Sequence, residues 1–125
     1  MDTRSKILTA AAASELLRGE TKIVAGFFDP ILASHAGRLR QIRDAEPSAA
    51  AVAVVLFDPE DPLLPGPARA ELVAALKSVD HVILPGPESA DLLTLVPEEL
   101  LFHEMEADKG RRLDLMRRVH GRSSA

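Results

Sequence analysis

Short apolar runs alternate with amphipathic stretches along most of the chain. The runs at 22–26, 51–57 and 82–84 are rich in β-branched or aliphatic residues and predict strands. The run at 51–57 is apolar on both faces, which is typical of a buried parallel strand. A further run at 100–102 predicts either a last strand or part of a helix that starts at Pro97.

The segments between these runs have helical spacing of apolar residues or high helix propensity. We predict helices over 7–18, 33–44, 68–78, 89–95 and 107–119. The stretch 58–67 contains four prolines and predicts a loop. Strands that alternate with helices predict βαβ units, so we expect one α/β domain over 1–125, with a parallel sheet covered by helices on both faces. Residues 121–125 are expected to form a flexible tail.

Composition and charge narrow the range of partners. The net charge is −4, so the chain lacks the basic surface that nucleic acid or an anionic membrane requires. It contains no cysteine, which excludes disulfides and cysteine-ligated metal. No apolar run is long enough to span a bilayer. Charged residues soon follow the apolar start at 7–13, which favours a cytoplasmic protein over a secreted one.

Candidate chemistry lies in the loops that follow the strands, at 27–34, 58–67 and 85–88, because ligands of parallel sheets bind beyond the carboxyl ends of the strands. Backbone N–H groups at the start of a helix bind anions. We therefore expect the amides just past 23–24 and the imidazole of His35 to converge on one spot sized for an anion.

The segment from Gly26 to Leu39 reads G-F-F-D-P-I-L-A-S-H-A-G-R-L. It resembles the motif G-x-F-D-x-x-H-x-G-H-x-x-x-L of the cytidylyltransferase-like nucleotidyltransferases. That family includes glycerol-3-phosphate cytidylyltransferase and the adenylyltransferase domain of ADP-heptose synthase. Residues 68–82 resemble the family segment R-A-x-x-L-x-x-L-x-x-V-D-x-V, and 119–124 resemble the start of its closing G-x-S-T-T stretch.

The resemblance implies a Rossmann-like fold and transfer of a nucleotidyl group from a nucleoside triphosphate to a phosphorylated sugar or alcohol. The triphosphate would bring Mg²⁺ with it, and no protein metal site is expected. The resemblance further implies that His35 is catalytic and that the nucleotide contacts Phe27, Phe28, Asp29, Ser34, Arg69 and Ser123. Positioning and charge stabilisation dominate reactions of this kind.

The chain departs from the family motif at two positions and in one loop. Leu32 stands where the family has its first histidine, and Ser34 replaces the motif glycine. Loss of one such donor typically lowers the rate by about two to three orders of magnitude. No lysine lies between Lys22 and Lys77, where the family supplies one for the phosphates. Three interpretations stay open: a transferase with weak or lost activity, an inactive binder of a nucleotide or phosphorylated metabolite, and a scaffold that forms a homodimer.

Simpler roles are open for several of these residues. Asp29 suits a turn or helix cap as well as a ligand contact. Arg69 could be a solvated charge, and Asp58 could contact a ribose or lie in a solvated loop. His103, Glu104 and Glu106 are spaced too closely for a convincing metal site. The arginines of the last predicted helix most simply form its solvated face; they are Arg111, Arg112, Arg117 and Arg118.

Overall fold

The computed structural model describes residues 3–15 and 20–123, with side chains as far as Val119. Five strands form the sheet: β1 (Ile7–Leu8), β2 (Thr21–Gly26), β3 (Ala51–Leu56), β4 (His81–Ile83) and β5 (Leu101–His103). The α-helices are α1 (Ala10–Ala13), α2 (Ala33–Asp44), α3 (Gly66–Ala74), α4 (Ser89–Thr94) and α5 (Met105–Ser123). Short 3-10 turns η1 (Thr3–Lys6) and η3 (Glu98–Leu100) precede β1 and β5.

The sheet is parallel throughout, in the order β1-β4-β3-β2-β5. β2 lies between β3 and β5, and its six residues pair with β3 from Thr21 opposite Ala51 to Gly26 opposite Leu56. The predicted strands at 22–26, 51–57 and 82–84 are confirmed to within a residue or two. At 100–102, the strand alternative is correct.

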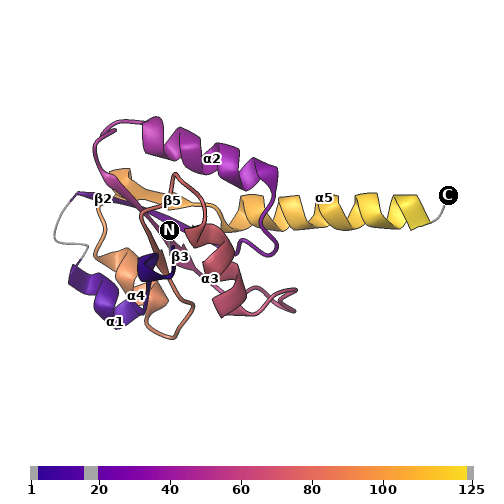
Figure 1. The fold of residues 1–125 in the computed structure, drawn as a ribbon, viewed down its shortest axis with the longest axis horizontal. Coiled ribbons are helices and arrows are strands. Elements are labelled where there is room, and N and C mark those ends of the chain that lie inside the picture. The colour runs from indigo at the N-terminus through magenta and orange to yellow at the C-terminus, as the bar shows by residue number, and fades with distance from the viewer. Residues whose placement is uncertain (1–2, 16–19, 124–125) are drawn as a thin grey trace.

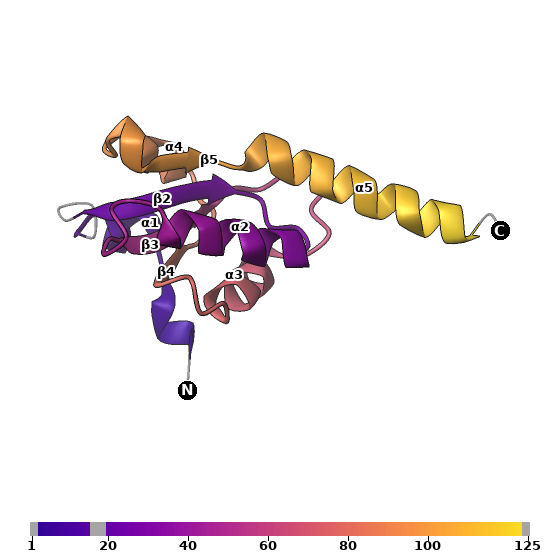
Figure 2. The same cartoon turned by 90° about the horizontal axis from the view of Figure 1, so that it is seen from above.

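Helices cover both faces of the sheet, as predicted (Figures 1 and 2). On one face, Val24 and Val54 pack with residues of α2 and α3 such as Leu39 and Val73. On the other, residues of β2, β3 and β4 pack against α1 and α4, where Leu92 is the main aliphatic contact. Successive strand residues point to opposite faces, so the unbroken apolar runs fill both layers.

The predicted helix over 7–18 is wrong in its first part. Ile7 and Leu8 form an edge strand opposite Val82 and Ile83, and the described helix α1 covers only Ala10–Ala13. Helix propensity favoured the helix, but pairing with β4 supplies a tertiary contact that local propensity does not contain. The predicted stop at Gly19 lies outside the described residues.

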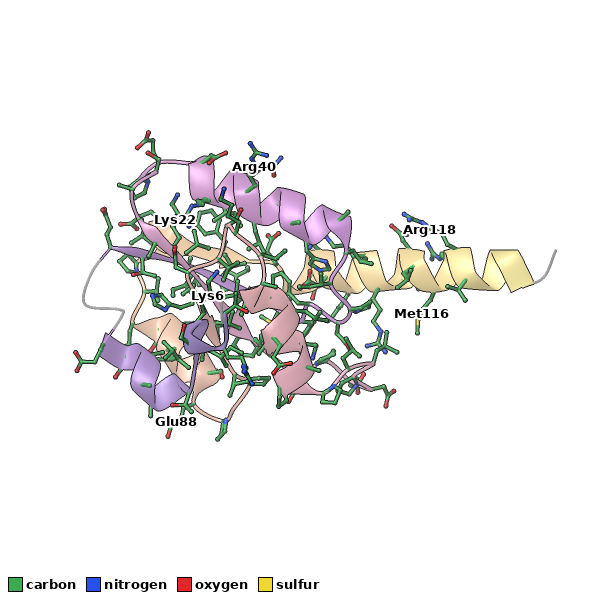
Figure 3. All side chains as sticks on the ribbon, in the orientation of Figure 1. Lys6, Lys22, Arg40, Glu88, Met116 and Arg118 are labelled. Atoms are coloured by element: carbon green, nitrogen blue, oxygen red, sulfur yellow. The ribbon has the colours of Figure 1, made fainter. Side chains whose placement is uncertain are left out.

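A buried lysine fixes α2 against the centre of the sheet. Lys22 has no exposed surface, and its Nζ donates to the carbonyls of Ile42 at 2.7 Å, Arg43 at 3.0 Å and Ala45. These carbonyls belong to the last turn and end of α2, where a cation satisfies otherwise unpaired acceptors. Figure 3 shows Lys22 below this end of the helix. The contact holds α2, and with it the turn that precedes α2, in place.

Helix α5 begins at the sheet and then projects beyond the rest of the molecule (Figures 1 and 2). Met116 and Arg118 extend from its distal part in Figure 3. The predicted tail over 121–125 overlaps this helix, whose backbone continues to Ser123, and flexibility there stays a prediction. Among the described helices, none is both long and apolar enough to cross a membrane.

Candidate functional site

A pocket of about 420 Å³ opens at the carboxyl ends of the central strands. β2 has β3 on one side and β5 on the other, so the strand order reverses at this point, where parallel sheets usually bind ligands. The pocket is lined by Phe27, Asp29, Pro30, His35, Asp58, Pro59, Glu60, Asp108, Lys109 and Arg112. Of the three loops in which candidate chemistry is expected, 27–34 and 58–67 line this pocket, and 85–88 lines a separate one.

The turn between β2 and α2 directs two backbone N–H groups to one point. Phe28 has a φ of 49°, in the left-handed region that few non-glycine residues adopt, and its ring is buried in the core. Consecutive N–H groups beside a left-handed residue form a concavity that binds anions. The amides of Phe27 and Phe28 form such a concavity here, because both reach the same oxygen.

His35 is buried and held in a single orientation. The backbone N–H of Leu32 donates to its Nδ1 at 2.9 Å, as in a helix capping box. The ring hydrogen therefore lies on Nε2, which faces the carboxylate of Asp108 at 2.8 Å. The Phe28 ring supports the imidazole from one side, with 4.9 Å between ring centroids.

The group that receives these donors is the carboxylate of Asp108, in the first turns of α5. Its Oδ2 accepts from the amides of Phe27 at 2.8 Å and Phe28 at 3.3 Å. Its Oδ1 accepts from His35 Nε2 at 2.8 Å and from Arg111 at 2.7 Å. The amides and the imidazole do converge on one anion-sized spot, as expected, but a side chain of this chain fills it.

The electrostatics of Asp108 are those of a bound anion. Burial by itself would raise the pKa of this carboxyl, but the hydrogen bonds from His35, the Phe27 amide and Arg111 outweigh burial and hold the pKa below its ordinary value. The side chain is only 2% exposed. The carboxylate is therefore ionised and fully enclosed by donors at neutral pH.

Gly26 leaves the room that Asp108 needs. A Cβ at this position would lie 2.6 Å from Asp108 Oδ2 and 2.6 Å from the Phe28 ring. In this structure the close neighbour is the carboxylate.

Asp29 holds the loop that follows β3. Its two carboxylate oxygens accept from the backbone N–H groups of Leu63 at 2.6 Å and Leu64 at 2.8 Å. Arg112 of α5 lies 3.8 Å from the same carboxylate and donates to the backbone of Asp61 at 2.7 Å. Asp29 lines the pocket, but its acceptors already serve the loop, which matches the alternative of a turn residue.

Arg69 is buried without exposed surface beneath the same rim. Its guanidinium donates to the carbonyls of Phe27 at 2.8 Å and Phe57 at 3.0 Å, and to that of Leu64 at 3.1 Å. It also forms an ion pair with Asp58, whose side chain is 59% exposed. The alternative of a solvated charge is wrong, and a nucleotide contact would have to compete with these internal acceptors.

Ser34, one of the predicted nucleotide contacts, does not line this pocket. Ser34 is exposed and lines a separate groove between α2 and α5, together with Leu32 and Arg118. The Ser123 side chain lies outside the described residues. The structure thus brings together Phe27, Asp29 and His35 in the pocket, with Phe28 and Arg69 directly behind its wall.

Among the residues considered for a metal site, Glu104 has structural partners. Glu104 is buried and pairs with Arg38 at 3.0 Å and Arg111 at 3.6 Å, whereas His103 and Glu106 are exposed. Within the described residues, no group of three potential ligands could hold a metal ion. The sequence interpretation missed Asp108, although its helical spacing with Arg111 and Arg112 marks one face of α5.

The site does not fit a triphosphate with Mg²⁺. The amides and imidazole that would hold a phosphate are bound to Asp108. The pocket lining contains four carboxylates, from Asp29, Asp58, Glu60 and Asp108, and two cationic side chains, from Lys109 and Arg112. An excess of negative charge opposes the entry of a polyanion.

Comparison with known proteins adds no family to this description. No family model, curated protein or solved structure matches the chain.

Proposed function

We propose that this protein is a Rossmann-like binding protein, related in design to the nucleotidyltransferases, that does not transfer nucleotidyl groups. Without the edge strand β1, the order β4-β3-β2-β5 corresponds to the 3-2-1-4 arrangement of Rossmann-like sheets. The single observation that carries the proposal is the Asp108 carboxylate, which is bound to the amide and imidazole donors that a phosphate would need. The proposal includes the cytoplasmic location that the sequence favours.

The pocket chemistry supports a ligand without a phosphate, such as a nucleoside or sugar. Its volume falls in the range of small-molecule sites, which is roughly 300–1,000 Å³. Phe27, Pro30 and Pro59 supply apolar surface, and the carboxylates of Asp58 and Glu60 are exposed acceptors for hydroxyl groups. Asp58 follows β3, the neighbour of β2 in the sheet, and acidic residues at the corresponding place in dinucleotide-binding folds contact ribose.

Thermal shift and calorimetry with paired ligands test this proposal. We expect nucleosides to raise the unfolding temperature and their triphosphates with Mg²⁺ to have no larger effect, because ligands stabilise only the state that binds them. Glu60→Gln should weaken the nucleoside effect. Glu71→Gln, which alters an exposed carboxylate on α3, is the matched control. A flat response to nucleosides, sugars and nucleotides alike would favour the scaffold alternative, including a homodimer.

Nucleotidyl transfer is the second candidate, since the donors around Asp108 are those that a phosphate would use. The assay combines the protein with each triphosphate, Mg²⁺, pyrophosphatase and phosphorylated sugars or alcohols. We expect no phosphate above a His35→Ala control. Release above that control would replace the proposed function by transferase activity.

A further inference from the structure

The donors around Asp108 belong to two different parts of the chain. Phe27, Phe28 and His35 lie in or next to the β2–α2 turn, whereas Arg111 shares α5 with the carboxylate. The first three are separated from Asp108 by more than 70 residues. We infer that the β2–α2 turn is a complete receptor for a small oxyanion and that Asp108 is its internal ligand. A free carboxylate or phosphate ion then takes the place of this side chain when it is shortened. This inference rests on the proposed function, because it concerns the same site.

The receptor keeps its shape without the carboxylate. The Leu32 amide orients the His35 ring, and the Phe28 ring supports it. The left-handed backbone at Phe28 aims both amides, and Lys22 anchors the far end of α2. None of these contacts involves Asp108, so we expect the three donors to stay convergent in its absence.

The arginine of the site is also held independently. Arg111 lies 3.6 Å from Glu104, and Glu104 accepts from Arg38 at 3.0 Å. The guanidinium therefore stays near the site when Asp108 is truncated. A substitution to alanine removes the three atoms of the carboxylate and leaves four donors around the space of a small oxyanion. Buried donors without acceptors are costly, which favours an anion that satisfies them.

The experiment compares Asp108→Ala with Asp80→Ala. Asp80 also accepts from a backbone amide and an arginine, but its side chain is 35% exposed and no histidine of the described chain hydrogen-bonds to it. Each variant is unfolded thermally in chloride, formate, acetate, sulfate and phosphate at equal ionic strength and pH. Formate and acetate test whether the site binds a free carboxylate, and sulfate and phosphate test whether it binds a larger tetrahedral ion.

We expect at least one oxyanion to raise the unfolding temperature of Asp108→Ala by about 5 °C when it is in tenfold excess over its Kd. Neither the wild-type protein nor Asp80→Ala should gain this increment. The double variant His35→Ala/Asp108→Ala should lose it. Amide resonances of Phe27 and Phe28 should shift with the same anion. An equal response of both single variants, or none in Asp108→Ala, overturns the inference.

If Asp108→Ala does not fold in chloride, the recovery of folded protein on refolding in each anion becomes the measurement. Recovery in formate or phosphate but not in chloride supports the inference, and equal failure in all of them overturns it. The proposed function is tested separately on the wild-type protein, where nucleotidyl transfer would overturn it. The two failures are therefore distinguishable.

Discussion

The two ends of the sheet each contain a carboxylate that links distant segments, and they differ in how that carboxylate is enclosed. At the amino ends of the strands, Asp80 accepts from the Val52 amide at 2.9 Å and from Arg43 at 2.8 Å, and it stays about a third exposed. At the carboxyl ends, Asp108 accepts from two amides, a histidine and an arginine and is almost fully buried.

We call Asp80, which only joins structural elements, a clamp, and we call the group of donors around Asp108 a cradle. The difference between the two is that between a structural contact and an anion-binding site. One amide and one partly exposed guanidinium suffice to join α2, β3 and the start of β4. The cradle around Asp108 has more donors than a clamp needs, a left-handed residue to aim them and a glycine that leaves space. Such a cradle is the design of an anion site, and here the anion is part of the chain.

The largest contrast should be in stability. Asp108→Ala leaves buried donors without an acceptor, and we expect it to lower the free energy of unfolding by about 3–5 kcal/mol. Asp80→Ala leaves donors that water can reach, so its cost should be about 1 kcal/mol. Urea unfolding of both variants measures the difference. Similar losses would show that the two carboxylates are equivalent clamps.

A smaller effect is expected from the space beside Asp108. Gly26→Ala places a methyl group in contact with the carboxylate and the Phe28 ring, which should cost about 1–3 kcal/mol. Gly37→Ala is the control, because a Cβ there has no neighbour within 4 Å and lies inside α2. It should stabilise by up to about 1 kcal/mol. Chemical denaturation of both variants measures the change in the free energy of unfolding. If Gly26→Ala does not lower it, Asp108 is free to move away from the added methyl group.

The smallest expected effect is the loss of folding stability at acidic pH. Burial raises the pKa of both carboxyls, but hydrogen bonds outweigh it, and each pKa lies below its ordinary value. A lowered folded-state pKa contributes stability that is present above the unfolded-state pKa and is lost as the pH falls through the folded-state value. Stability should therefore decline below about pH 4, and Asp108→Asn should flatten this decline more than Asp80→Asn. Unfolding free energies measured between pH 2 and about 6 test the order.

The sheet could be predicted from the sequence because its central strands are nearly uninterrupted β-branched and aliphatic runs. The strand at Ile7–Leu8 could not, since only its pairing with Val82 and Ile83 distinguishes it from the start of a helix. The position of His35 at the carboxyl ends of the strands followed from its place after the first central strand. Its role as a nucleotide ligand stays a prediction.

The occupant of the site was beyond the reach of the sequence. Asp108 is 73 residues from His35 and lies among charged residues typical of a solvated helix. Its contact depends on how α5 leaves β5, which no local pattern specifies. Arg69 was ambiguous for the same reason, because its acceptors are backbone carbonyls at the ends of two other segments.

The guanidinium of Arg69 affects how tightly a ligand can bind in the pocket. By joining the carbonyls of Phe27, Phe57 and Leu64, it ties the β2–α2 and β3–α3 connections into one stiff rim. A ligand that enters between them meets walls already in place and loses little free energy to ordering them. The pocket would therefore bind its ligand as a rigid receptor does, and the shape of the pocket would determine which ligands are selected.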